Sequence, residues 1–402
     1  VGIKGLMDAD LQLRQQRKAR ALVFAPNQAL PSAWSEADIN MYTNALGLPA
    51  QRCELLTRSP KSKMMDADFI LVNYDKLSMP HNGGRQNVYR KIIADLLPSI
   101  DLLIVDECHN LKNLGRNRVD AFKEIVENTK DKNVLMLSAT PIPTNLPDAG
   151  FLLYMIDPIR FLHYATQPFD YDQDQFSIRN AMNSGSWFSF SRADVKQLFN
   201  LPPLIETTPH RVELTEEQSK KYLEVWKDGS MGIDKVPRLS RILLEAEVND
   251  IAELVKDIRT KTPDAQVAIF SFYKEGFTAE AARRITQQGC GTVETITGDC
   301  ALKERLLRAK RFRNGDTNVL INTTQTMSES ISLCTGSRPA YVIFAEPPSV
   351  PAEYDQAVGR FYRLGLKAPV TVIETIPASA KLNAIMVAEQ QRSKADGVHF
   401  RN

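Results

Sequence analysis

The sequence predicts an α/β protein built from two parallel sheets in tandem, each flanked by helices. Short apolar runs alternate with amphipathic segments over most of the 402 residues, which is the pattern of parallel strands joined by crossover helices. The alternation stops in an aromatic and acidic stretch after residue 157 and resumes in the second half of the chain. Because a chain of this length can bury more than one core, we expect domains at residues 1–157 and 251–402, with a short helical or irregular connector at 158–250.

In the first block, each apolar run ends in polar residues, as a buried parallel strand does at the edge of its sheet. Pro26 stops the first run, so the residues after it are expected to form a polar loop. Amphipathic helices are expected at the start of the chain, where the segment ends in basic residues, and around Phe122. The expected first helix is Val1–Arg20, and strands are expected within Ala21–Trp34, Phe69–Ser78, Leu102–Asn110 and Val134–Asn145.

The second block repeats this alternation. Two segments with helical periodicity, Leu214–Asp228 and Leu239–Lys261, lead into it. Because the two blocks are alike, we expect a duplicated lobe with a cleft between the two copies. The strands expected in the second block are Val267–Tyr273, Thr292–Asp299, Val319–Thr324, Ala340–Pro347 and Val370–Ile376.

The composition excludes several classes of protein. No apolar run approaches the length that spans a bilayer, and the basic N-terminal segment lacks the apolar core of a signal peptide, so we expect no membrane partner. The five cysteines are scattered and form no CxxC pair, which favours reduced thiols over zinc ligands. We therefore expect an intracellular protein, cytoplasmic in a prokaryote or phage and nuclear in a eukaryote. The net charge of +2 is too small to indicate a polyanionic partner by itself.

Two acidic residues, Asp106 and Glu107, directly follow the apolar run at residues 102–105. In open α/β sheets the carboxyl ends of the strands form the edge that binds ligands. A carboxylate at this edge can hold a Mg²⁺ ion on nucleotide phosphates, and its neighbour can orient or deprotonate a water molecule. Taken alone, these residues fit a solvated turn after a core strand equally well.

Motifs along most of the chain resemble the Swi/Snf-type branch of the superfamily-two helicases and translocases, which are ATPases related to the DEAD/DEAH-box proteins. The resemblance runs from Ala21 to about Met386 in the family's order. ALVFAPNQALPSAW is similar to its first DNA-contacting motif, DECH with LKN behind it to its DEAH box, and LSATPIPTNL to its coupling motif. LPPLIETTPHRVELTEEQ is similar to its hinge, and QAVGRFYRLG to its arginine motif.

The resemblance implies two RecA-like lobes, ATP and Mg²⁺ as cofactors, and DNA as the partner, with double-stranded DNA favoured. Asp106 would hold the metal through water and Glu107 would act as the base. A helix carrying Gln356, Arg360 and Arg363 would bring two arginines from the second lobe onto the nucleotide. Arginine suits a transferring phosphoryl group because its planar fork is always charged. The alternative is a surface helix with solvated arginines.

Further roles follow from the resemblance alone. Glu329 would contact the nucleotide together with Asp106 and Arg363. Coupling between the lobes would involve His109, Ser138, Ala139 and Thr140. Hydroxyl and amide side chains expected in loops after strands, where they can reach phosphate oxygens, give the nucleic-acid candidates Asn27, Tyr74, Ser271, Thr324 and Gln325.

The sequence departs from the family pattern in one respect that affects the chemistry. No G-x-x-x-x-G-K-S/T occurs anywhere in it, so the loop that cradles the β- and γ-phosphates is missing. We expect that this chain is a fragment whose phosphate loop lies upstream, and that the 402 residues alone hydrolyse little ATP.

We therefore expect the motor core of an ATP-driven DNA translocase. A strand-separating helicase of the kind that viruses use in transcription is one alternative, since those proteins also carry DECH and SATP boxes. A non-catalytic nucleic-acid-binding scaffold that has lost its phosphate loop is the other. The sequence does not identify protein partners, of which a nuclease would be one example.

Overall fold

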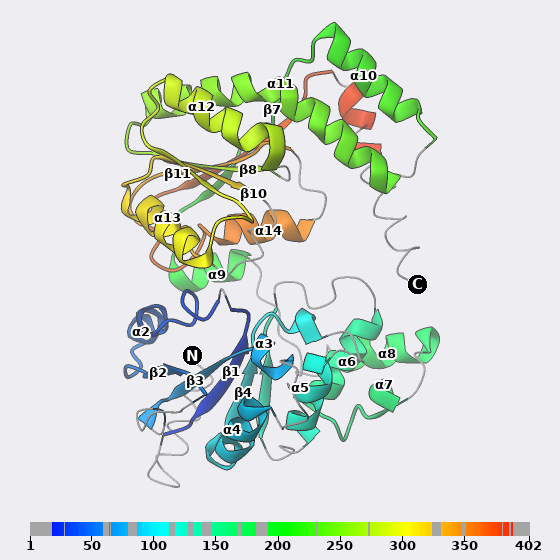
Figure 1. Ribbon diagram of the computed structural model, residues 1–402, viewed down its shortest axis with the longest axis vertical. Coiled ribbons are helices and arrows are strands. Elements are labelled where there is room, and N and C mark those ends of the chain that lie inside the picture. Colours follow the sequence, from blue (N-terminus) through cyan, green and yellow to red (C-terminus); the bar gives the residue numbers. More distant parts are fainter. Residues whose placement is uncertain are drawn as a thin grey trace. The chain divides into compact units, whose positions relative to one another are not determined.

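The computed structural model divides into two compact units, Val1–Ser189 and Phe190–Asn402 (Figure 1). A transmembrane span is absent from the part of the chain that the structure describes, because none of its helices is both long and apolar enough. The described residues are 18–27, 29–58, 64, 66–78, 87–111, 117–127, 132–138, 146–166, 170–181, 192–229, 232–271, 274–323, 331–346, 351–379, 381–385 and 387–388.

The first unit is organised around a parallel sheet, which within the described residues has five strands in the order β2-β3-β1-β4-β5. Its central strands are buried along their whole length, as expected for apolar runs covered on both faces. The strands predicted at the starts of four segments are confirmed, and β2 was not predicted. The strands are β1 (Ala21–Ala25), β2 (Cys53–Leu55), β3 (Phe69–Asn73), β4 (Leu102–Val105) and β5 (Asn133–Met136).

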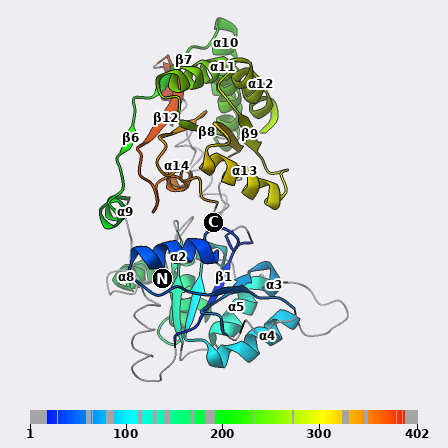
Figure 2. The same ribbon diagram turned by 90° about the vertical axis from the view of Figure 1, so that its left-hand side faces the viewer.

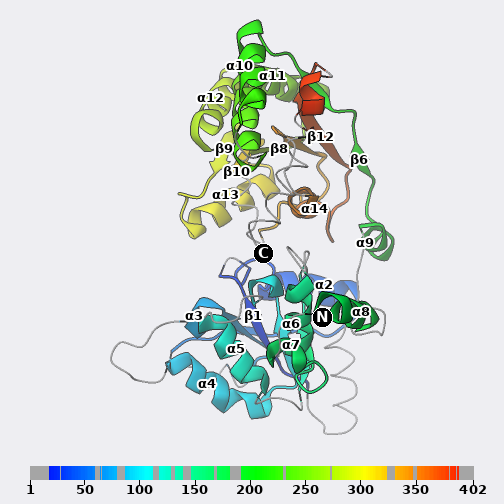
Figure 3. The same cartoon turned by 90° about the vertical axis from the view of Figure 1, so that its right-hand side faces the viewer.

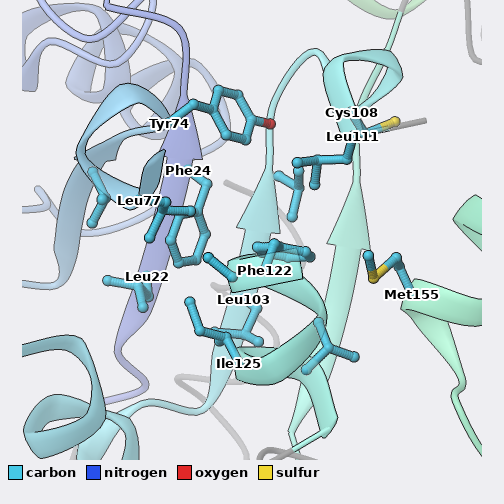
Figure 4. Packing of buried hydrophobic residues seen from close by; sticks show 14 of the residues in the cluster. Leu22, Phe24, Tyr74, Leu77, Leu103, Cys108, Leu111, Phe122, Ile125 and Met155 are labelled. Carbon is cyan, nitrogen blue, oxygen red and sulfur yellow. The ribbon is translucent and has the colours of Figure 1, made fainter. Parts of the chain in front are cut away.

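Helices cover both faces of this sheet (Figures 2 and 3). Side chains alternate along β1, so that Leu22 and Phe24 enter one core and Val23 enters the other. Phe24 meets Phe122 edge-on at 5.1 Å in the larger core (Figure 4). The α-helices are α2 (Glu36–Ala45), α3 (Asp75–Ser78), α4 (Val88–Leu96), α5 (Asn117–Glu127), α6 (Leu146–Ile156), α7 (His163–Thr166) and α8 (Tyr171–Ala181); η2 (Leu97–Ser99) and η3 (Cys108–Leu111) are 3-10 turns.

The second unit has its own parallel sheet, in the order β6-β12-β11-β8-β10-β9, with β7 also pairing with β12. The five strands predicted for the second block are confirmed, although β9 and β11 are shorter than expected. The short strands β6 and β7 lie in the stretch predicted as a connector. The strands are β6 (Leu204–Glu206), β7 (His210–Val212), β8 (Gln266–Ser271), β9 (Val293–Ile296), β10 (Val319–Thr323), β11 (Ala340–Phe344) and β12 (Val370–Pro377).

Helices on the two faces of the second sheet form separate cores. α11 and α12 pack on one face, and α9, α13 and α14 pack on the other. The predicted helix at Leu214–Asp228 is confirmed as α10, whose start is fixed by a capping box between Thr215 and Gln218. The helices are α9 (Arg192–Phe199), α10 (Glu216–Lys227), α11 (Gly232–Lys261), α12 (Ala279–Gln287), α13 (Leu302–Asn314) and α14 (Pro351–Gly359), and Lys274–Thr278 forms a π-helical turn.

One expected helix lies mostly outside the described residues, and its described end needs correction. The predicted helix Val1–Arg20 lies outside them up to residue 17, and Lys18–Arg20 is not helical. Arg20 instead begins the approach to β1, where its backbone N–H donates to Asp101 at 2.9 Å and its guanidinium donates to Ser99 at 2.7 Å. The basic end of this segment therefore makes structural contacts at the amino edge of the first sheet.

Candidate functional site

The acidic pair lies at the carboxyl end of β4, as the sequence predicts. The turn is attached to the strands on both sides of β4. The Asp106 backbone N–H donates to the Phe24 carbonyl on β1 at 2.8 Å, and the Cys108 N–H donates to the Leu137 carbonyl after β5 at 2.9 Å. Backbone bonds on both sides fix where the two carboxylates leave the sheet.

The Asp106 carboxylate is oriented by two donors. Trp34 Nε1 donates to Oδ2 at 2.8 Å, and the Glu107 backbone N–H donates to Oδ1 at 3.0 Å. A carboxylate offers about four acceptor positions, so one that accepts from these two groups can also accept from the water molecules of a hydrated metal ion. Oxygen is the ligand that Mg²⁺ prefers, and that ion is commonly held by one or two carboxylates together with substrate phosphates.

The described residues do not build a metal cage of their own. Among them, no group of three or more His, Cys, Asp or Glu side chains is arranged to hold a metal ion. A single fixed carboxylate fits a metal ion that arrives with a nucleotide, because the phosphates and water then supply the remaining ligands.

Glu107 has a backbone conformation that is uncommon for its residue type. Its φ is +50°, in the left-handed region. A residue with a side chain costs roughly 1–2 kcal/mol in this region, and such strain is found disproportionately at functional sites. The backbone of the turn is therefore strained at Glu107, the residue predicted to be the base.

Tyr74 was predicted to contact nucleic acid from a loop, and the structure corrects that interpretation. Its side chain is only 2% exposed and belongs to the large core of the first unit (Figure 4). Its hydroxyl donates to the Asp106 backbone carbonyl at 2.5 Å. Tyr74 therefore holds the acidic turn from inside the core, through its hydrogen bond to the Asp106 carbonyl, and does not reach the surface.

Cys108 is buried and chemically quiet. Burial first, and then the nearby carboxylates of Glu107 and Asp106, raise the pKa of its thiol to about 12. A protonated thiol is a poor nucleophile. The Cys108 thiol therefore stays protonated inside the core at neutral pH.

The predicted coupling residues are only partly described. The backbone of His109 forms part of η3, and its side chain lies outside the description. Ser138 follows β5 and is half-buried. Ala139 and Thr140 lie outside the described residues.

The remaining nucleic-acid candidates differ in their surroundings. Asn27 is exposed in the turn after β1, as expected. Ser271 is not in a loop, because it is the last residue of β8 and is 1% exposed. Its hydroxyl donates to the buried carboxylate of Glu346 at 3.2 Å. Thr324, Gln325 and the nucleotide candidate Glu329 lie outside the described residues.

The arginine motif is not a continuous helix, which corrects the prediction. α14 ends at Gly359, and the chain then turns. Arg363 Nε donates back to the Gly359 carbonyl at 3.1 Å, and the Arg360 carbonyl accepts from the Leu333 N–H at 2.9 Å. Arg360 is 7% exposed, while Gln356 and Arg363 are half-buried. The three residues are therefore brought together by the end of α14 and the turn after it.

Trp34 is the site residue that sequence reasoning missed. It lies 72 residues from Asp106 in the chain, so no local pattern connects the two. The available signal was an indole in an otherwise polar loop after a predicted strand, because a half-buried indole N–H usually finds an acceptor.

Two family models match this chain. Residues 6–143 match the type III restriction enzyme, res subunit, and residues 247–365 match the helicase conserved C-terminal domain. No curated protein matches it.

One solved helicase shares its fold at low sequence identity. The DUF1998 helicase MrfA bound to DNA and AMPPNP is 13% identical with a TM-score of 0.53, and the match covers 95% of this chain and 45% of that one. This chain therefore spans less than half of that helicase. A substituted Dbp5 of S. cerevisiae bound to RNA and ADP BeF3 is 16% identical with a TM-score of 0.46, over 93% of this chain and 75% of that one.

Proposed function

We propose that this chain, a superfamily-two helicase-like protein, is the motor core of a Swi/Snf-type translocase that hydrolyses ATP to move along nucleic acid. Double-stranded DNA is the proposed track. Its affinity for the protein would come mainly from phosphate contacts and would fall steeply with added salt. Asn27 is a suitable contact in the first unit because its amide is exposed in the turn after β1.

One observation supports this proposal most directly, the acidic turn after β4. Asp106 is held by donors on both carboxylate oxygens, and Glu107 follows it in a strained left-handed conformation. Fixed carboxylates at the carboxyl edge of a parallel sheet suit nucleotide chemistry, since catalysis of phosphoryl transfer depends mainly on positioning and on charge.

The proposed roles divide between the two residues. Asp106 would hold Mg²⁺ through its water molecules, and Glu107 would accept a proton from the attacking water or orient it. When bound with a nucleotide, the metal neutralises charge on the phosphate oxygens. Arg360 and Arg363 would stabilise the charge that develops on the transferred phosphoryl group.

The experiment is nucleic-acid-stimulated ATP hydrolysis by the full-length protein and its Glu107→Gln variant. The variant keeps the size of the side chain and removes the base, so we expect it to bind ATP normally and to lose turnover by about a hundredfold or more. Glu124→Gln on α5 is the matched control, because this side chain is 65% exposed and forms an ion pair with Arg90. Equal turnover in wild type and Glu107→Gln would remove Glu107 from the mechanism.

The absent phosphate-loop motif gives a second test. Because no G-x-x-x-x-G-K-S/T occurs in the 402 residues, we propose that this stretch alone hydrolyses little ATP. The assay is ATP turnover by the 402-residue chain with and without DNA. Robust turnover would show that another group in this chain replaces the phosphate loop.

A strand-separating helicase is the second candidate, and the sequence DECH at residues 106–109 favours it. Displacement of a third strand from a triplex reports translocation, whereas displacement of a duplex strand reports unwinding. Triplex displacement without duplex unwinding would support the translocase. Nucleic-acid binding by a full-length protein that has no ATP turnover would instead indicate a scaffold.

A further inference from the structure

Trp34 connects two parts of the first unit that the proposed function assigns to different tasks. It lies at the end of the loop after β1, immediately before Ser35, which caps α2. Its indole N–H donates to Asp106 Oδ2 at 2.8 Å. The nucleic-acid candidate Asn27 lies at the other end of the same loop.

The loop is compact and internally bonded. The Ala29 N–H donates to the Pro26 carbonyl at 3.0 Å, and the Trp34 N–H donates to the Ala29 carbonyl at 3.0 Å. Ala29 and Leu30 are buried against the sheet, whereas Asn27 and residues 31 and 33 are exposed. Among its described residues, the loop therefore exposes the amide of Asn27 together with Pro31 and Ala33, while Ala29 and Leu30 fix its inner side to the core.

The indole ring is held by packing as well as by its hydrogen bond. It packs at the edge of the smaller core of the first unit, and its ring centroid lies 6.2 Å from that of Phe69 on β3, at an interplanar angle of 52°. An indole N–H can only donate. The rotation of an aspartate carboxylate about its last bond is otherwise broad. A displacement of the loop would therefore change the orientation of the Asp106 carboxylate.

We propose that Trp34 is a positioning residue through which nucleic acid bound at the loop of residues 26–35 sets the orientation of the Asp106 carboxylate. The inference rests on the proposed function, because it assigns nucleic acid to this loop and the metal to Asp106. It adds a route within the first unit by which the polymer controls ATP turnover. No contact with the second unit is needed for this step.

Two replacements separate the hydrogen bond from the packing. Trp34→Phe keeps an aromatic ring and removes the donor. Benzothienylalanine at position 34 keeps the shape of the indole and carries sulfur in place of N–H, so it is the variant that preserves folding best. Trp226→Phe on α10 is the matched control, since that side chain packs in a separate cluster of the second unit.

The first readout does not depend on activity. Manganese bound with AMPPNP to the full-length protein is followed by electron paramagnetic resonance, with and without a duplex oligonucleotide. A group that orients a metal ligand is typically worth 10- to 100-fold in metal affinity. We expect both position-34 replacements to weaken Mn²⁺ binding by about tenfold and to abolish the effect of the duplex on that affinity. We expect Trp226→Phe to bind as wild type does.

The second readout is the ratio of ATP turnover with duplex to turnover without it. We expect the replacements at position 34 to reduce this ratio about tenfold while duplex affinity stays within about twofold of wild type. Wild-type ratios and wild-type Mn²⁺ affinity in both replacements would overturn the role of Trp34 and leave the proposed function intact. Wild-type protein that neither binds duplex nor shows any stimulation would overturn the proposed function itself.

Discussion

Replacing Glu247 by glutamine should flatten the dependence of the second unit's stability on pH. Glu247 lies on α11 and has no exposed surface. Burial raises the pKa of its carboxyl well above the usual range, and the neighbouring carboxylates of Glu346 and Asp250 raise it further. Above the ordinary pKa of a carboxyl group, the folded protein therefore keeps the proton on Glu247 to a higher pH than the unfolded chain does.

The sign of the effect follows from where the proton is held. The folded pKa lies above the unfolded value, so the stabilisation is complete below the unfolded pKa of about 4.3 and is lost as the pH rises towards the folded value. Within that window the folded state holds one proton more than the unfolded state. Within this window the free energy of unfolding falls by about 1.4 kcal/mol per pH unit. Glutamine at position 247 has no titrating proton, so this contribution to the pH dependence is absent in the variant.

The assay is urea unfolding between pH 5 and pH 8, followed by Trp226 fluorescence in proteins that carry phenylalanine at positions 34 and 187. Trp226 reports on the second unit because α10 packs against α11. Glu245→Gln on the same helix is the matched control, since its side chain is 61% exposed. A slope in Glu247→Gln equal to that of wild type would refute the reasoning.

Three further changes test the first unit, each by urea unfolding. Tyr74→Phe removes the donor to the carbonyl of the acidic turn and should cost about 1 kcal/mol. Phe122→Ala empties a fully buried site and should cost about 3–5 kcal/mol, whereas Phe176→Ala at a side chain that is 69% exposed should stay within about 0.5 kcal/mol. Glu107→Gly relieves the left-handed backbone and should add about 1 kcal/mol. Equal effects of the two phenylalanine changes, or destabilisation by Glu107→Gly, would contradict the packing and the strain described here.

The long apolar strands could be predicted from the sequence because a covered parallel sheet demands continuous apolar runs. β2 and β6 escaped prediction since each has three residues and is only partly buried. The end of α14 was also missed. Apolar residues continue at helical spacing past Val358, and yet the Phe361 N–H bonds to the Val358 carbonyl three residues back, which closes a turn.

The acidic pair could be predicted because its position depends only on where a strand ends. The surroundings of the pair could not. A tyrosine after a strand can turn outward to the solvent or inward to the core, and Tyr74 turns inward, where its hydroxyl finds the Asp106 carbonyl. Ser271 was expected in a loop for the same reason and is held inside by Glu346. Such side-chain orientations depend on partners that are distant in the sequence, and a single sequence does not show which residues those partners are.

The pairing of β6 and β7 with β12 has a consequence for folding during synthesis on the ribosome. The Thr207 hydroxyl bonds to the Val372 carbonyl across 165 residues, so one edge of the second sheet waits for the last strand to be translated. At roughly 5–20 residues per second, that delay is about 8–33 seconds, during which the first unit can already fold. A nascent chain arrested before Val370 would therefore display unpaired β-edges, which are the surfaces that chaperones and aggregation compete for.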